Sequence, residues 1–346
     1  MPHPAIENAT GFAMEPIFTS DENGQPLLVV VLKATIAIGD GGRLSLHEKQ
    51  VPVNIAGEPY GEPGKSSYKY EPETAPAKAA TDVVVIADAY ARHSGDTQVD
   101  VRFRAGSLDK TVRVTGDRYW LTSLGLVGAT SPEPFESIPL TYERAFGGYD
   151  PDSTPEQPIF DQRNPVGSGY HAKSRKHDSL RLPNIEDPAR PISGYDDRPD
   201  PAGFGFLSPD WAWRAKFAGT YDSAWMRDRM PLLPFDFDPK FYNAASPGLV
   251  APSYLRGGET VSLTNCTPNG ALEFILPAIE PSSCEVELRH VGLHPLEPRF
   301  DTLILNARER LLFQIGRARL ALPNGAHDVA SIRVRSAHLP APGQEF

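Results

Sequence analysis

The side chains that could do chemistry are four carboxylates set among aromatic rings. Carbohydrate hydrolases combine two acids with rings that stack on sugars. In an irregular chain, however, acids more often accept backbone N–H bonds or pair with arginine. We therefore expect structural roles for these acids, with a glycoside hydrolase or a lectin as the alternative. The acids are Glu143, Asp222, Asp236 and Asp238, and the arginines near them in sequence are Arg144, Arg214, Arg227 and Arg229.

Other catalytic and metal-binding patterns are missing from the sequence. His290 and His294 have the spacing of two ligands on one helix face, but Gly292 and Pro295 disfavour a helix there. The sequence contains no HExxH motif, no paired CxxC motif and no GxSxG elbow. The expectation is therefore no catalytic residue, no metal and no cofactor.

The two cysteines, Cys266 and Cys284, are separated by seventeen residues. This spacing permits a disulfide without favouring one, and two buried thiols in a reducing compartment are the expectation.

Charge and composition argue against nucleic-acid and membrane partners. The 346 residues carry a net charge of −10, and the nearest approach to a basic run is KSRKH at 173–177. Residues 1–18 lack the basic region and apolar core of a signal peptide. The longest apolar run, 27–38, is interrupted by Lys33 and is too short to span a bilayer. These features favour a cytoplasmic protein.

Short runs rich in Val, Ile, Tyr and Thr predict β-strands in the first 120 residues. Residues 98–104 alternate strictly between polar and apolar side chains, as one half-buried antiparallel strand does. Glycine in the AGS sequence at 105–107 suits a hairpin turn. The predicted strand regions are 27–38, 81–90, 97–104 and 108–117.

The middle of the chain differs from both ends. Residues 132–252 hold eighteen of the 35 prolines, which excludes long regular strands or helices. They are also rich in aromatic residues, so we expect ordered, irregular coil packed on a core, with a short helix near 222–230 that Asp222 caps and Pro231 stops. From residue 258 strands return, and NARER at 306–310 reads as a hairpin connection.

The predicted fold is thus mainly β, with antiparallel sheets or a sandwich built from the N- and C-terminal regions and a few short helices. The predicted divisions are a β region at 1–130, the irregular region at 131–255 and a second β region at 256–346. Whether these form one domain is left open.

The large aromatic residues of the middle region are candidates for binding a partner, because tryptophan and tyrosine are favoured anchors of protein interfaces. Filling the core beneath the coil is the commoner fate of such rings. The candidates are Phe204, Trp211, Trp213, Tyr221 and Trp225.

Several long strings then resemble a bacterial family catalogued as a domain of unknown function, whose genes lie beside those of type VI secretion spike proteins and toxic effectors. The strings are YGEPGKSSYKYEPETAPAKAATDVVV at 60–85, GDRYW at 116–120, PFESIPLTYERAFGG at 134–148, RNPVGSG at 163–169, LPNIEDPARPI at 182–192, PAGFGF at 201–206, the segment 218–245 and YLRGGETVSL at 254–263.

This resemblance implies an effector adaptor or chaperone: a non-catalytic cytoplasmic protein that binds a toxin and helps to load it onto the secretion spike. The motif residues would then hold the coil in place, with Gly147 and Gly148 adopting dihedrals forbidden to other residues. The partners would be the effector protein and the spike protein. The expected structural residues are Tyr142, Glu143, Arg144, Phe146, Gly147, Gly148, Asn164, Pro165, Gly167, Asn184, Asp222, Arg229, Asp236 and Asp238.

Overall fold

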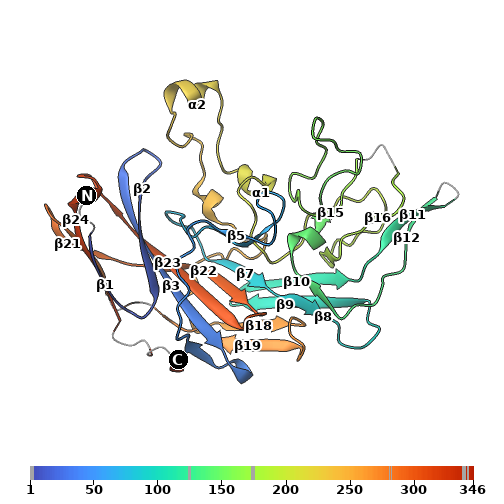
Figure 1. Cartoon of the computed structure of the whole chain (residues 1–346), viewed down its shortest axis with the longest axis horizontal. Helices are drawn as coiled ribbons and strands as arrows, with labels where there is room; N and C mark the ends of the chain where they lie inside the picture. The colour runs from blue at the N-terminus through green and yellow to red at the C-terminus, as the bar shows by residue number, and fades with distance from the viewer. Residues whose placement is uncertain are drawn as a thin grey trace.

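The structure is a computed structural model that describes residues 4–123, 126–172, 176–279, 281, 283–336, 340 and 343–346. Strands make up most of its regular structure, and the helices are short (Figure 1). The prediction of a mainly β fold with several antiparallel sheets is confirmed. Strands from the two ends of the sequence hydrogen-bond within the same sheets, so the regions 1–130 and 256–346 are built together.

The central sheet has the strand order β2-β3-β23-β22-β7, with β4 also paired to β3. All pairs are antiparallel except β22 with β7. The hairpin predicted at 306–310 joins β22 to β23, where Asn306 pairs with Leu311. The strands are β2 (Ala13–Ser20), β3 (Pro26–Ile38), β4 (Leu44–Leu46), β7 (Asp82–Ile86), β22 (Arg299–Asn306) and β23 (Leu311–Ala321).

The apolar run in β3 follows from burial on both faces of this sheet. Val29 and Val31 point into the main core. Leu28, Val30 and Leu32 point the other way, into a second core shared with a four-stranded sheet. A strand covered on both sides needs apolar residues at every position. The covering sheet has the order β1-β24-β20-β21, with β1 (Ala5–Ala9), β20 (Ser283–Leu288), β21 (Gly292–Leu296) and β24 (Val329–Arg335).

A third sheet, of order β17-β10-β9-β18-β19, encloses the main core. In β9 exposed and buried residues alternate along its whole length, as the sequence predicts. Leu108 pairs with Ala105, so Gly106 and Ser107 form the turn, and Gly106 has φ +54°. The strands are β9 (Gln98–Ala105), β10 (Leu108–Thr115), β17 (Ile185–Glu186), β18 (Thr260–Thr264) and β19 (Ala271–Ile275).

The irregular region lies over these sheets as ordered coil with short elements, as predicted (Figure 1). Phe204, Phe206 and Trp211 are buried in the main core. The predicted helix is α2, and the Asp222 carboxylate caps it by accepting a 2.8 Å bond from the Trp225 N–H. The elements of this region are β13 (Ser137–Pro139), β14 (Phe146–Gly147), β15 (Ser168–Gly169), β16 (Leu180–Arg181), α1 (Ala212–Ala215), α2 (Ser223–Asp228) and the 3₁₀ helices η2 (Tyr142–Arg144) and η3 (Pro239–Tyr242).

The structure contains several strands that the sequence did not predict. Strands such as β1 have few buried residues, so their sequences lack the apolar pattern that identifies a strand. β1 is exposed at every residue, and β2 contains Pro16 and pairs only with β3. The predicted strand 81–90 is divided at Ala87 into β7 and β8, which belong to different sheets. The remaining elements are β5 (Glu58–Pro59), β6 (Tyr68–Tyr70), β8 (Asp88–Tyr90), β11 (Tyr119–Ser123), β12 (Leu126–Ala129), η1 (Asp40–Gly42) and η4 (Ala326–Asp328).

Cys266 and Cys284 are both buried free thiols, which confirms that part of the cysteine prediction. Burial raises the pKa of Cys266 and raises that of Cys284 to about 11. The thiolate is the form of cysteine that reacts. We therefore expect neither thiol of the folded protein to react with Ellman's reagent at pH 8 within minutes. The same protein in 6 M guanidinium, about the strength that unfolds most domains, should release two equivalents. Equally fast reaction of the folded protein would contradict this assignment.

Candidate functional site

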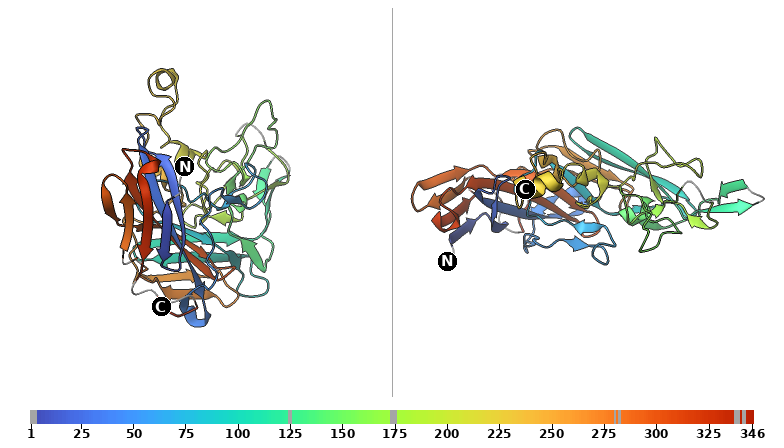
Figure 2. Two further views of the ribbon diagram at one scale, coloured as in Figure 1. Left: turned by 60° about the vertical axis from the view of Figure 1, so that its left-hand side comes forward. Right: turned by 90° about the horizontal axis from the view of Figure 1, so that it is seen from above.

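The most prominent surface feature is a projecting segment, residues 217–238, which we call the arm. It carries α2 away from the sheets (Figures 1 and 2). Its base is closed by a 3.0 Å bond from the Asp238 N–H to the Phe217 carbonyl. Thr220 donates its N–H and its hydroxyl to the Asp236 carboxylate at 2.9 and 2.7 Å. These bonds hold the pKa of Asp236 below its ordinary value. The arm is therefore a defined element with its own hydrogen bonds.

The tip of the arm folds around Trp225. Its indole N–H donates to the Leu232 carbonyl at 2.8 Å. The Tyr221 ring packs edge-on against it, with ring centroids 4.8 Å apart. The helix and the returning chain are thus held together by one tryptophan that is only partly buried.

Arg229 connects the arm to the turn between β2 and β3. Its guanidinium donates to the Leu233 carbonyl at 2.7 Å and to the Glu22 carbonyl at 2.5 Å. It also lies over the Phe235 ring, 4.5 Å from the centroid. Gly24 of the same turn touches Leu232 so closely that a Cβ there would lie 2.7 Å from a Leu232 methyl. The arm is consequently seated on the β2–β3 turn.

The outer surface of the arm exposes large apolar side chains. Met226 is 64% exposed, Met230 60% and Phe235 80%, and Tyr221 is also exposed. The whole sequence has only four methionines, so half of them lie on this element. Methionine is flexible and polarizable, and it suits surfaces that bind protein partners. Exposed apolar groups gathered on a projecting element are typical of an interaction site.

A cleft of about 810 Å³ separates the arm from the central sheet. Its lining comes from the arm, η3, the β2–β3 turn, residues 76–79 and strands β22 and β23. The residues lining the cleft include Asp21, Glu22, Asn23, Leu27, Lys78, Arg229, Leu233, Phe235, Phe237, Tyr242, Tyr254, Glu297, Arg299, Asp301, Arg317 and Arg319.

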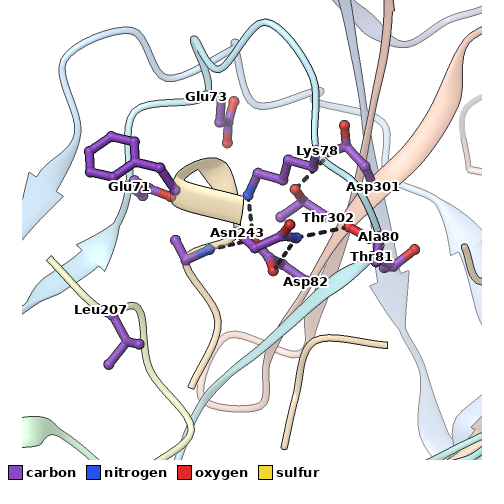
Figure 3. A network of polar contacts seen from close by, with 12 residues as sticks. Glu71, Glu73, Lys78, Ala80, Thr81, Asp82, Leu207, Asn243, Asp301 and Thr302 are labelled. Carbon is purple, nitrogen blue, oxygen red and sulfur yellow. Dashed lines mark hydrogen bonds and ion pairs between the residues drawn. The ribbon is translucent and has the colours of Figure 1, made fainter. Parts of the chain in front are cut away.

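Members of two buried ion pairs, Lys78, Asp301 and Arg317, line the cleft. Figure 3 shows the contacts around Lys78 and Asp82. Lys78 and Asp82 are joined by a 2.6 Å ion pair, and neither side chain is more than 3% exposed. Asp82 also accepts bonds from the Asn243 amide at 2.9 Å and from the Ala244 N–H at 2.8 Å. Asp82 thereby joins β7 to the coil that follows η3.

A second buried pair joins Asp301 to Arg317, on the neighbouring strands β22 and β23. Burial raises the pKa of Asp301, and the attraction of Arg317 opposes that shift. Thr302 donates to Asp301 at 3.0 Å, and Arg317 donates to the Glu73 carbonyl at 3.1 Å. The lining of the cleft therefore combines the buried charged side chains of Lys78, Asp301 and Arg317 with apolar side chains of the arm, Leu233, Phe235 and Phe237.

The five predicted partner-binding aromatics lie in two different environments. Phe204 and Trp211 are buried in the main core, and Trp213 packs against it. Tyr221 and Trp225 belong to the arm. Tyr221 is exposed, whereas Trp225 and Trp213 are each partly buried, so the arm presents one of the five rings openly to solvent.

The four candidate acids each accept hydrogen bonds from their surroundings. Glu143 accepts from the N–H and the hydroxyl of Ser67 at 2.6 and 3.0 Å. Asp238 accepts from the Lys240 N–H at 2.9 Å, and Asp222 and Asp236 hold the arm as described. These contacts give each acid a role in fixing the chain.

Residues 139–150, PLTYERAFGGYD, are held by buried amide and hydroxyl groups. Tyr142 donates to the Ser246 hydroxyl at 2.9 Å and packs edge-on against Trp211. The Asn164 side chain donates to the carbonyls of Tyr142 and Phe146 at 2.8 and 2.9 Å. This part of the chain is a closely bonded coil.

Neighbouring motif residues extend the same bonding. Arg144 donates to the Asn184 side chain at 3.2 Å, and Pro165 is half-buried. Gly147 and Gly148 have φ +142° and +92°, which confirms their predicted dihedrals. Gly167 lies so close to Asn164 that a Cβ could not be accommodated.

Sequence reasoning missed the two methionines and Phe235 as candidate contacts. The available signal was their position: Met226 lies in a helix too short to bury it, and Met230 and Phe235 follow that helix on either side of Pro231. Residues 173–175 of the basic KSRKH cluster lie outside the described residues. Among the described residues, no helix has the length and apolar character needed to cross a bilayer.

Comparison with known proteins supplies the family. No curated protein and no solved structure matches the chain. A family model described as an uncharacterized protein conserved in bacteria (DUF2169) matches residues 23–317. This match covers most of the 346 residues, and the chain therefore belongs to the DUF2169 family.

Proposed function

We propose that this protein is a non-catalytic adaptor that binds a secreted effector and helps to load it onto the type VI secretion spike. The observation that carries the proposal is the arm, which presents Tyr221, Met226, Met230 and Phe235 to solvent beside a cleft. The assignment to type VI secretion rests on the resemblance of the collinear motifs. Under this proposal the protein acts in the bacterial cytoplasm, before secretion.

The arm and the cleft suit a partner segment with apolar side chains. Apolar groups on the partner would pack on the methionines and Phe235, and the cleft would take up the adjoining chain. The net charge of −10 favours encounter with a basic effector region. Binding that favours the folded effector over its unfolded form would stabilise the effector by mass action.

The carbohydrate-active alternative has less support. Its four acids are engaged in capping α2, in closing the arm and in holding Ser67. A glycosidase needs two carboxyl groups facing each other across the sugar, about 5–9.5 Å apart. Acids that fix local chain geometry are poorly suited to that task.

The arm predicts a specific loss of effector binding. The double variant Met226→Ser with Phe235→Ser removes exposed apolar surface without touching the bonds made by Trp225. We expect recovery of the effector with tagged protein, expressed in the native bacterium, to fall at least about tenfold, the effect of losing one or two interface anchors. Quantitative mass spectrometry of the co-purified proteins measures this change.

A matched control replaces equally exposed apolar residues elsewhere. Leu126 and Ile275 are 76% and 66% exposed, on β12 and β19. The variant Leu126→Ser with Ile275→Ser should recover the effector as the wild type does. Equal loss in both variants would argue against the arm as the binding site. Absence of any toxin or spike protein from the wild-type sample would overturn the adaptor proposal itself.

A further inference from the structure

Two carboxylates and an imidazole converge at a place remote from the arm. Asp150 and Asp152 follow β14, and His177 belongs to the segment that leads to β16. One ligand atom from each residue lies within 4.8 Å of the other two. The Nε2 atom of His177 is 3.8 Å from Asp150 Oδ2 and 3.9 Å from Asp152 Oδ2. The three groups thus surround one small volume.

The imidazole nitrogen lacks a hydrogen bond. His177 Nε2 is buried and has no hydrogen-bond partner, and the ring as a whole is 14% exposed. Distances of 3.8 and 3.9 Å are too long for hydrogen bonds. Buried polar atoms in folded proteins are nearly always satisfied, so an unsatisfied one needs an explanation. A cation between the imidazole and the carboxylates would supply the missing partner.

The surrounding chain holds the ligand atoms in place. Asp150 is buried, and its Oδ1 and Oδ2 atoms accept from the N–H groups of Asp152 at 2.7 Å and Ala172 at 2.5 Å. A carboxylate oxygen can accept twice, so Asp150 Oδ2 retains a site for a cation. The backbone N–H of His177 donates to the Tyr195 hydroxyl at 2.7 Å, which fixes the chain at this residue. Bonds from outside the site, such as those that Asp150 accepts, orient the ligands of metal sites.

We propose that Asp150, Asp152 and His177 bind one divalent transition-metal ion of the Zn²⁺ or Mn²⁺ class. Ligand bonds of about 2.0–2.2 Å place ligand atoms about 3.0–3.5 Å apart at tetrahedral or octahedral angles. The separations of 3.8 and 3.9 Å from His177 Nε2 need to close by less than about 1 Å to reach this range. The imidazole favours such ions over Mg²⁺ and Ca²⁺, which take oxygen ligands.

The site has a route to solvent and a structural consequence. The Asp152 side chain is 42% exposed, so an ion and its water ligands can enter from that side. A bound ion would join the loop after β14 to the segment before β16 and would add to the bond between the Ala172 N–H and Asp150. This inference is independent of the proposed adaptor function.

Titration calorimetry on the full chain tests the proposal. Protein freed of metal with EDTA is titrated with ZnCl₂ and, separately, with MnCl₂. We expect one equivalent to bind, and His177→Gln to weaken that binding at least tenfold for both ions. The control His93→Gln alters an exposed histidine outside the cluster and should bind as the wild type does.

A second variant protects the test from misfolding. Asp152→Asn removes a charge at the exposed ligand and should also weaken binding at least tenfold, with circular dichroism confirming the fold. Failure of the wild type to bind one equivalent overturns the proposal. Unchanged affinity in the folded variants, or tighter binding of CaCl₂ than of ZnCl₂, overturns it equally.

Discussion

Replacing Asp82 by alanine is expected to lower the free energy of unfolding by about 3–5 kcal/mol, because it leaves a buried charge without its partner. Lys78 is 3% exposed at its side chain, and Asp82 is its 2.6 Å ion-pair partner. The same carboxylate accepts from Asn243 and from the Ala244 N–H. The substitution therefore leaves the Lys78 ammonium, the Asn243 amide and the Ala244 N–H without the carboxylate that accepts their hydrogen bonds.

Equilibrium unfolding in urea, followed by tryptophan fluorescence, measures this change. Asp100→Ala is the matched control, since Asp100 pairs with Arg113 at 2.7 Å but its side chain is 44% exposed. Solvent screens that pair, so its loss should cost less than about 1 kcal/mol. Asp82→Asn, which keeps the size and one acceptor, should fall between the two. If Asp82→Ala cost no more than Asp100→Ala, the buried network would have no special role in stability.

Local patterns predicted the elements that depend on local physics. The alternation of polar and apolar residues in β9 predicts which face of the strand packs on the core, and Gly106 predicts the turn that follows. Both predictions need only residues that are close together in the sequence. The α2 cap needed only Asp222 before the helix and Pro231 after it. Gly147 and Gly148 indicated a backbone with positive φ, because residues with a side chain adopt that conformation only at a cost in free energy.

Features that depend on distant residues could not be predicted. Lys33 reads as an interruption of an apolar run, yet it is buried in a 2.7 Å ion pair with Glu73, forty residues away. The pairing of β3 with β23 likewise joins segments near opposite ends of the chain. Nothing in either segment identifies the other as its partner.

The candidate site shows the same division. Trp211 and Trp225 are alike as residue types, but one is in the core and the other holds the arm. Which aromatic faces solvent depends on how far the chain between residues 217 and 238 leaves the sheets (Figure 2). Sequence composition indicated an aromatic-rich region with candidates for partner binding, and only the fold separates its exposed rings from its buried ones.

Gly148→Ala is the second substitution with a large expected effect. Gly148 has φ +92°, a conformation that costs an alanine about 1–2 kcal/mol. A Cβ there would also collide with the Gly167 carbonyl oxygen and lie 2.9 Å from its carbon. The backbone itself must move to relieve this contact, and Gly148 is fixed by bonds from its N–H to the Asn164 carbonyl and from the Asp161 N–H to its own carbonyl.

We therefore expect Gly148→Ala to lower the free energy of unfolding by about 3 kcal/mol or more, the range of severe backbone and packing defects. Gly64→Ala separates the two causes, because Gly64 has φ +76° but no atom within 4 Å of its Cβ position. Its cost should be the dihedral cost alone, about 1–2 kcal/mol. Urea unfolding of both variants gives the difference. Equal losses of unfolding free energy in the two variants would mean that the backbone around Gly167 can shift to accept the new Cβ at little cost. In that case the close packing at Gly148 would not fix the position of the coil over the sheets.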